Sequence, residues 1–210
     1  MGEIIVAGFA PLGRVPELEE DMAQRIPLRK IVIAGALGAV AIVLGATRLG
    51  FIPWILGPGF ELTIMAVPVI IGAILEGPMV GAAVGLLFGV FSMIQDTSGL
   101  FKNPLTAILP RMLVGVVAWL AYLPFKAKLV RVGSAVAGVA GSLTNTVLVL
   151  GALTILYPKS VPFGLAVKVA MINGFMEAAI AAVLCLAVVG VWKGVESRSG
   201  KARLAKDEGK

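Results

Sequence analysis

Histidine is absent from this sequence of 210 residues, and cysteine occurs once, as Cys185. Without histidine, the chain lacks the base of a Ser–His or Cys–His nucleophile and the ligands of a Cys/His metal site. Cys185 lies in the apolar run AAVLCLAVVG, which predicts an inert small hydrophobic side chain rather than half of a disulfide. A P-loop of the form G-x-x-x-x-G-K-[ST] is also missing. We therefore expect no enzymatic activity, no metal and no cofactor.

Charged residues make up only 14% of the chain, whereas 59% of its residues are hydrophobic and the mean hydropathy is +0.99. A soluble domain is about a quarter charged and not quite half apolar. The difference predicts that lipid, rather than water, surrounds most of the chain. The 26 glycines agree with this, because small residues let membrane helices approach one another closely.

Six apolar segments predict an all-α membrane protein with six transmembrane helices. They cover residues 31–50, 62–75, 79–95, 104–125, 132–157 and 163–192. The second segment is short for a complete span, which indicates that part of the preceding loop enters the membrane. Residues 1–28 form a predicted cytoplasmic N-terminal tail, residues 29–193 a single six-helix membrane domain, and residues 194–210 a basic cytoplasmic tail.

The loops differ in positive charge, which predicts the orientation of the helices. With both termini on one side of the membrane, that side carries most of the 18 Lys and Arg residues, and the opposite side carries only Arg48, Lys102 and Lys159. Cytoplasmic loops are the ones enriched in Lys and Arg. We therefore predict that both termini are cytoplasmic, and that the net charge of +6 reflects topology rather than a nucleic-acid surface.

Arg111 lies inside the fourth predicted helix, seven residues after Pro104 and so about 10 Å along the helix axis. A charge at the bilayer centre costs about 2.5–3.5 kcal/mol on insertion scales, so such a group faces a cavity or pairs with an opposite charge. One hypothesis is that Arg111 binds an anion. The alternative is an ion pair with Glu177 or Asp96 that only holds helices together.

Polar side chains also occur in the fifth and sixth predicted helices. Asn145 lies mid-helix beside Thr144, and it either bonds a neighbouring helix or lines a polar cavity. Asn173 and Glu177 are four residues apart, which places them on one helix face. An amide and a carboxylate one turn apart suit a ligand with hydroxyl or amide groups, although a buried structural network explains them nearly as well.

Aromatic residues gather in the loop after the first predicted helix, at Phe51, Trp54 and Phe60. They are typical of an interfacial aromatic belt. The alternative is a lid that closes over a bound molecule, with Gly57 and Gly59 as its hinges.

Small residues recur at four-residue spacing on the first predicted helix, as Ala34 with Gly38 and Gly35 with Ala39. This spacing lets two membrane helices pack closely. The partner is either another helix of the same chain or a separate membrane subunit.

Together these segments resemble the substrate-binding S components of energy-coupling factor (ECF) vitamin transporters, over residues 29 to about 192. The resemblance is carried by LRK at 28–30, GFIP at 50–53, PVIIGAILEGPMVGAAVGLLFGVFSM at 68–93, NPLTAILPRMLVG at 103–115 and GSLTNTVLVLG at 141–151. The NPL-x-x-x-LPR and GSLTNT segments are the most specific, because they are far from generic hydrophobic sequence.

The resemblance implies a six-helix protein of the cell membrane that captures a vitamin with high affinity from outside. Uptake then needs a transmembrane coupling (T) subunit and two ATPase subunits on other chains. In this family the first helix docks to the coupling subunit, which here maps onto Ala34, Gly35, Gly38 and Ala39. Substrate is held by the first outer loop, the loop between helices three and four, and helices four to six. The corresponding side chains are Trp54, Phe60, Asn103, Arg111, Thr144, Asn145, Asn173 and Glu177.

Within the family, the sequence is most similar to the group assigned to pantothenate. Pantothenate is a small anion with an amide and two hydroxyls, which Arg111 and the amides of Asn145 and Asn173 suit. Biotin, folate, niacin and lipoate are anions too, and riboflavin remains an alternative because related members share several of these segments. A membrane enzyme or a stand-alone secondary transporter fits less well, because buried ionisable residues are few and no internal repeat is evident.

Overall fold

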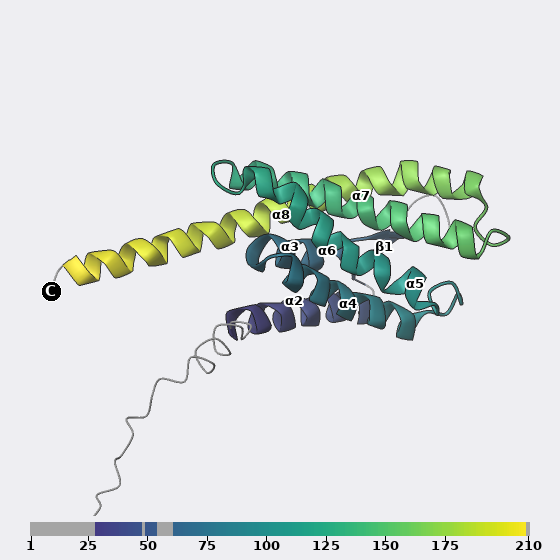
Figure 1. Cartoon of the computed structure of the whole chain (residues 1–210), viewed down its shortest axis with the longest axis horizontal. Helices are drawn as coiled ribbons and strands as arrows, with labels where there is room; N and C mark the ends of the chain where they lie inside the picture. Colours follow the sequence, from purple (N-terminus) through teal and green to yellow (C-terminus); the bar gives the residue numbers. More distant parts are fainter. Residues whose placement is uncertain (1–27, 48, 54–60, 209–210) are drawn as a thin grey trace, which may run out of the picture.

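The computed structural model describes residues 28–47, 49–53 and 61–208, and this part of the chain is helical apart from one small hairpin (Figure 1). The helices are α2 Leu28–Ala46, α3 Ala66–Glu76, α4 Pro78–Gln95, α5 Pro104–Ala107, α6 Leu109–Tyr122, the 3-10 turn η1 Leu123–Phe125, α7 Val130–Leu156 and α8 Phe163–Glu208, and the strands are β1 Phe51–Pro53 and β2 Glu61–Thr63. Five segments are long and apolar enough to cross a membrane, and α3 is a shorter apolar helix of 11 residues. The predicted fold class, with six apolar helical segments, is confirmed.

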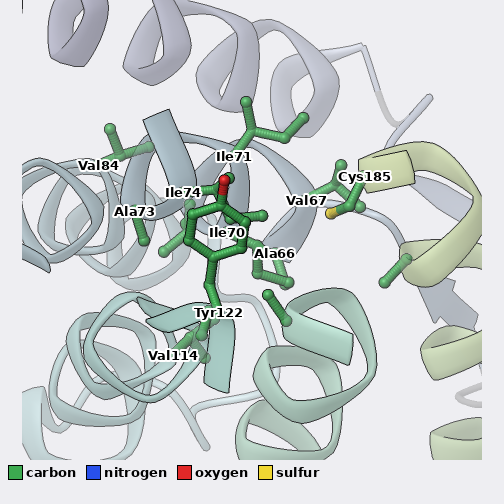
Figure 2. Packing of buried hydrophobic residues seen from close by; sticks show 14 of the residues in the cluster. Ala66, Val67, Ile70, Ile71, Ala73, Ile74, Val84, Val114, Tyr122 and Cys185 are labelled. Carbon is green, nitrogen blue, oxygen red and sulfur yellow. The ribbon is translucent and has the colours of Figure 1, made fainter. Parts of the chain in front are cut away.

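Helix α3 lies at the centre of the bundle and packs against α2, α4, α6, α7 and α8. Every residue from Ala66 to Ile74 is buried. Figure 2 shows Ile70 of α3 in a cluster that includes Tyr122 of α6 and Cys185 of α8. Because protein rather than lipid surrounds α3, this helix has no need to match the thickness of the bilayer. Its central position accounts for its short length.

The turn between α3 and α4 is tight because of two adjacent residues. Gly77 has a φ of 99°, which a residue with a side chain rarely adopts, and its N–H donates to the carbonyl of Ala73 at 2.9 Å. Pro78 then begins α4, at a position where a helical N–H has no partner in any case. The turn lies at the break between the segments predicted over residues 62–75 and 79–95.

The span predicted over residues 104–125 is confirmed with the same bounds, but its helix is interrupted at residue 108. Helix α5 ends at Ala107 and α6 begins at Leu109. Pro110 has no N–H, so the carbonyl of Thr106, four residues earlier, receives no helical hydrogen bond. The interruption leaves one buried backbone oxygen that needs another partner.

A two-stranded antiparallel sheet follows α2, where the sequence predicts a loop and the first residues of the helix over 62–75, which begins only at Ala66. Strands β1 and β2 pair with Phe51 opposite Thr63 and Pro53 opposite Glu61. The hairpin lies between the end of α2 and the start of α3, and its second strand packs against α8. The segment before α3 is therefore held in place by the helix bundle.

The start of α2 and the distal part of α8 lie on one side of the bundle. Nε of Arg29, in α2, lies 2.7 Å from Oε1 of Glu76 at the end of α3, and its Nη2 atom lies 3.2 Å from Oε1 of Glu196 in α8. Lys193 adds a further contact, with Nζ 2.9 Å from Oε2 of Glu196. This arrangement agrees with the even number of membrane crossings that the charge count predicts.

The outward faces of the helices are apolar. Large side chains such as Ile155, Phe175 and Val183 are 78%, 76% and 67% exposed, respectively. An apolar surface of this extent is typical of contact with lipid, because a soluble protein rarely exposes one. The membrane location predicted from hydropathy therefore has a structural counterpart.

Helix α8 is longer than predicted. The sequence predicts its end at residue 192, but the helix continues to Glu208 and projects from the bundle (Figure 1, yellow). No proline follows Trp192, and most of the residues that do follow favour helix. The predicted basic tail is therefore helical over most of its length.

Candidate functional site

Five buried polar residues, here called the polar layer, lie in α6, α7 and α8: Arg111, Asn145, Thr146, Asn173 and Glu177. Close packing of α7 and α8 brings the four residues of these two helices to a similar height. A Cβ added at Gly174 of α8 would lie 3.2 Å from Cγ2 of Thr146, so α7 and α8 are in contact next to Asn145 and Asn173. On α6, Arg111 follows Pro110, which lines the same surface groove as Val147 of α7. The layer lies at the hairpin end of the bundle.

Arg111 is held in place by the close approach of α4 to α6. Gly81, Gly85 and Gly89 lie every fourth residue along α4, and each meets the backbone of α5, α6 or the residue between them. A Cβ at Gly89 would lie 2.7 Å from Cα of Ile108, and one at Gly85 would strike the carbonyl of Arg111. Only glycine permits this backbone contact, so α4 fixes the height of Arg111 in the bundle.

The guanidinium of Arg111 has partners that the sequence did not predict. It is 6% exposed, and its Nη1 donates to the carbonyl of Thr106, the oxygen that Pro110 leaves without a helical partner. Its carbon Cζ lies 5.4 Å from the ring centroid of Phe88 and 4.9 Å from that of Phe101. Its Nε is buried and has no hydrogen-bond partner.

The predicted ion pair of Arg111 with Glu177 or Asp96 is not among the salt bridges of the described residues. Asp96 instead organises the loop after α4, where Oδ1 accepts from Ser98 N at 2.9 Å and Oδ2 from Phe101 N at 3.0 Å. Slight burial raises the pKa of Asp96, but the hydrogen bonds from Ser98 and Phe101 outweigh it, and the pKa lies below its ordinary value of 3.8. The ionised carboxylate thus positions Phe101 over Arg111.

The two asparagines have buried amide oxygens that lack a hydrogen-bond partner. Asn145 and Asn173 are each 6% exposed, and Oδ1 of each is unpartnered. Leaving such a group buried and unsatisfied costs about 1–3 kcal/mol, so it calls for an explanation. Both oxygens lie in the polar layer, where a ligand with hydroxyl or N–H groups would satisfy them.

Two other predicted site residues form hydrogen bonds with nearby backbone groups. Thr144 is half-buried and donates through Oγ1 to the carbonyl of Ala140 at 2.7 Å, within α7. Asn103 caps α5, because its Oδ1 accepts from the N–H of Leu105 at 2.9 Å. The structure therefore gives both residues a local role and does not bring them into the polar layer.

Glu177 differs from the asparagines because both of its oxygens have partners within the chain. Oε1 accepts from the backbone N–H of Thr63 at 2.8 Å, and Oε2 lies 3.3 Å from Oγ1 of Thr146, whose single hydroxyl proton is shared with the carbonyl of Ser142 at 3.2 Å. The carboxylate is 8% exposed and connects β2, α7 and α8. The hydrogen bonds of Glu177 therefore join elements of the chain to one another.

The structure divides the four small residues of α2 between two faces. Gly38 is buried, and a Cβ there would lie 2.5 Å from Cδ1 of Leu87 on α4. Ala34 is partly buried against the core. Gly35 and Ala39 are exposed, and nothing lies within 4 Å of a Cβ at Gly35. Gly38 thus packs within the chain, and Gly35 with Ala39 remain open to a partner.

The predicted aromatic contributors Trp54 and Phe60, and the hinges Gly57 and Gly59, lie outside the described residues. Sequence reasoning missed several residues that the structure places at the site, namely Thr63, Phe88, Phe101 and Thr106. One of them could have been found. A proline removes the hydrogen bond to the carbonyl four residues earlier, which identifies Thr106 as an acceptor near Arg111.

Comparison with known proteins identifies the family of this chain. A family model for the substrate-specific component of ECF transporters matches residues 29–191, which contain the helix bundle to the end of its membrane part and the whole polar layer. The chain is also similar to the pantothenic acid transporter PanT of Lactococcus lactis subsp. cremoris (strain MG1363), with 33% identity over 150 residues that cover 60% of this chain and 75% of the relative. The chain therefore belongs to the substrate-specific components of ECF transporters, which are non-enzymatic transport proteins of the cell membrane.

Proposed function

We propose that this S component binds pantothenate from outside the cell. The observation that carries the proposal is a set of unpartnered buried groups in the polar layer: Nε of Arg111 as a donor and the amide oxygens of Asn145 and Asn173 as acceptors. The similar protein from Lactococcus lactis is named a pantothenic acid transporter, which favours the same substrate.

The chemistry of these groups matches that of pantothenate. Its carboxylate suits Arg111, because a guanidinium forms charge-assisted hydrogen bonds with a carboxylate. Its two hydroxyls and its amide N–H are donors that suit the oxygens of Asn145 and Asn173. Phe88 and Phe101 flank the guanidinium and shield it from water, which strengthens its attraction to an anion.

Transport requires partners, and the proposed ones are a transmembrane coupling subunit and two ATPase subunits. The docking face we propose is the exposed side of α2 around Gly35 and Ala39, because its small residues let another helix approach closely. We also propose that both ends of the chain lie in the cytoplasm, as the distribution of Lys and Arg predicts. Labelling of introduced cysteines tests this orientation: an impermeant reagent is expected to reach residue 160 but not residue 199 in intact cells, and the reverse pattern contradicts it.

The substrate is tested by calorimetry of the purified chain in detergent against a panel of water-soluble vitamins, without ATP. We expect tight one-to-one binding of pantothenate and much weaker binding of its neutral amide analogue. Equal affinity for both would mean that no carboxylate is recognised. Tight binding of riboflavin with none of pantothenate would contradict the substrate assignment while leaving the family membership intact.

A further inference from the structure

We propose that Glu177 is a positioning residue that anchors the β1–β2 hairpin to α7 and α8, and that it does not contact the substrate. The inference rests on the proposed function in one respect: it takes the polar layer as the substrate site. It corrects the interpretation of Glu177 as one of the substrate-binding side chains, because it assigns both carboxylate oxygens to the protein itself.

The anchor connects segments that are far apart in the sequence. Thr63 ends β2, and its N–H donates to Oε1 of Glu177 across a sequence separation of 114 residues. The other carboxylate oxygen lies 3.3 Å from Oγ1 of Thr146, on α7. One side chain thus holds the second strand of the hairpin against the two helices that carry Asn145 and Asn173.

The surroundings of Thr63 agree with an anchored strand end. Leu62 and Met65, on either side of it, are each 1% exposed, and the N–H of Met65 donates to Oγ1 of Thr63 at 3.3 Å. The N–H of Ile64 donates to the carbonyl of Gly50 at 3.0 Å. The backbone from β2 into α3 is therefore fixed by apolar packing and hydrogen bonds, and Glu177 supplies the only one from a helix side chain among those of the described residues.

Three variants at residue 177 test the anchor without any substrate. Glu177→Gln keeps an acceptor for Thr63 and a donor for Thr146 at the same reach. Glu177→Asp keeps the charge but is one methylene shorter, and Glu177→Ala keeps neither. Thr146→Val is the matched control, because it removes the hydroxyl that contacts Glu177 and the carbonyl of Ser142 but leaves the hydrogen bond from Thr63 to Glu177.

The measurement is hydrogen–deuterium exchange of the Thr63 amide, resolved to that residue, in the full chain. We expect exchange about tenfold faster or more in Glu177→Ala and in Glu177→Asp, because the acceptor of the Thr63 hydrogen bond is absent or too short to reach. The Gln variant and Thr146→Val remain within about threefold of the unmodified chain, because the acceptor stays in place. Unchanged exchange in both the Ala and Asp variants would overturn the proposal, and the Asp variant decides if the Ala variant does not fold.

Calorimetry then separates positioning from substrate contact. Glu177→Ala is expected to weaken pantothenate and its neutral amide analogue by the same factor, whereas Glu177→Gln restores both affinities. A change in the ratio of the two affinities in Glu177→Gln would show that the carboxylate faces the ligand, which contradicts the proposal. If the chain binds no pantothenate at all, the proposed substrate is wrong, and the exchange data still decide whether Glu177 is an anchor.

Discussion

Small residues recur every fourth position on both α4 and α2, but their neighbours differ. A Cβ on α4 at Gly85 or Gly89 would strike the backbone of the α5–α6 segment, which cannot move without shifting a helix. On α2, a Cβ at Gly38 meets only the end of the flexible Leu87 side chain, and one at Gly35 meets nothing. The α4–α6 contact is therefore a rigid part of the proposed binding site, whereas α2 around Gly38 meets a flexible side chain on one face and is open on the other at Gly35.

Leucine at Gly85 is expected to have the largest effect of any single change in this comparison. The new side chain would have to displace the backbone at Arg111, so we expect no folded protein. The milder Gly85→Ala is expected to lower the melting temperature and weaken pantothenate binding together, since it moves Arg111. Gly151→Ala is the control, because nothing lies within 4 Å of a Cβ there. A Gly85→Leu variant that folds and binds pantothenate normally would show that the contact between α4 and α6 is not rigid.

The same substitution on α2 is expected to separate binding from assembly. Gly35→Leu leaves pantothenate affinity unchanged and abolishes complex formation with the coupling subunit, because the exposed face becomes bulky. Gly38→Leu instead lowers the stability of the isolated chain, since Leu87 lies in its way. Co-purification and thermal melting measure the two effects. Normal assembly of Gly35→Leu would exclude this face as the docking surface.

Arg111→Lys probes the group that α4 positions. The variant keeps a positive charge but loses the planar fork, so pantothenate affinity is expected to fall about 10- to 100-fold for each charge-assisted bond lost. Affinity for the neutral amide analogue changes less. Arg111→Ala also frees the carbonyl of Thr106 and is expected to reduce stability as well. Equal losses for the acid and the amide would indicate that Arg111 has only the structural role.

A substitution in the loop after α4 is expected to have the smallest effect on pantothenate affinity. Asp96→Asn weakens the hold on Phe101 and is expected to reduce pantothenate affinity by about threefold, the scale of one modest hydrogen bond. Because the folded-state pKa of Asp96 is lowered from 3.8, its contribution is complete above that value and is lost only as the pH falls through the lower folded value. The contribution of Asp96 to affinity is therefore expected to stay constant between pH 5 and 8. A loss of affinity near pH 6 that disappears in Asp96→Asn would contradict this.

Hydropathy and turn chemistry predict much of the fold, because lipid contact and the Gly77-Pro78 turn are local properties of the chain. The central place of α3 is not local. Its residues are apolar in lipid or in protein, so composition alone cannot distinguish the two surroundings. The hairpin is missed for a related reason: its anchor, Glu177, lies on a distant helix.

For the site, the sequence identifies the polar residues but not their partners. Arg111, Asn145 and Asn173 are evident as polar groups in apolar helices. Sequence reasoning sought a charged partner for Arg111, whereas the structure shows a backbone carbonyl and two aromatic rings. The two faces of α2 are likewise indistinguishable in sequence, since both carry small residues at the same spacing.

The short, enclosed helix α3 has a consequence for how the protein responds to its membrane. At 1.5 Å per residue it is about 16 Å long, roughly half of a hydrocarbon core of about 30 Å. Hydrophobic mismatch acts on helices that touch lipid, which tilt when the bilayer thins or thickens. Helix α3 is shielded from that force by its neighbours. Lipids of different chain length are therefore expected to alter the tilt of α2 and α8 while the centre of the bundle keeps its geometry.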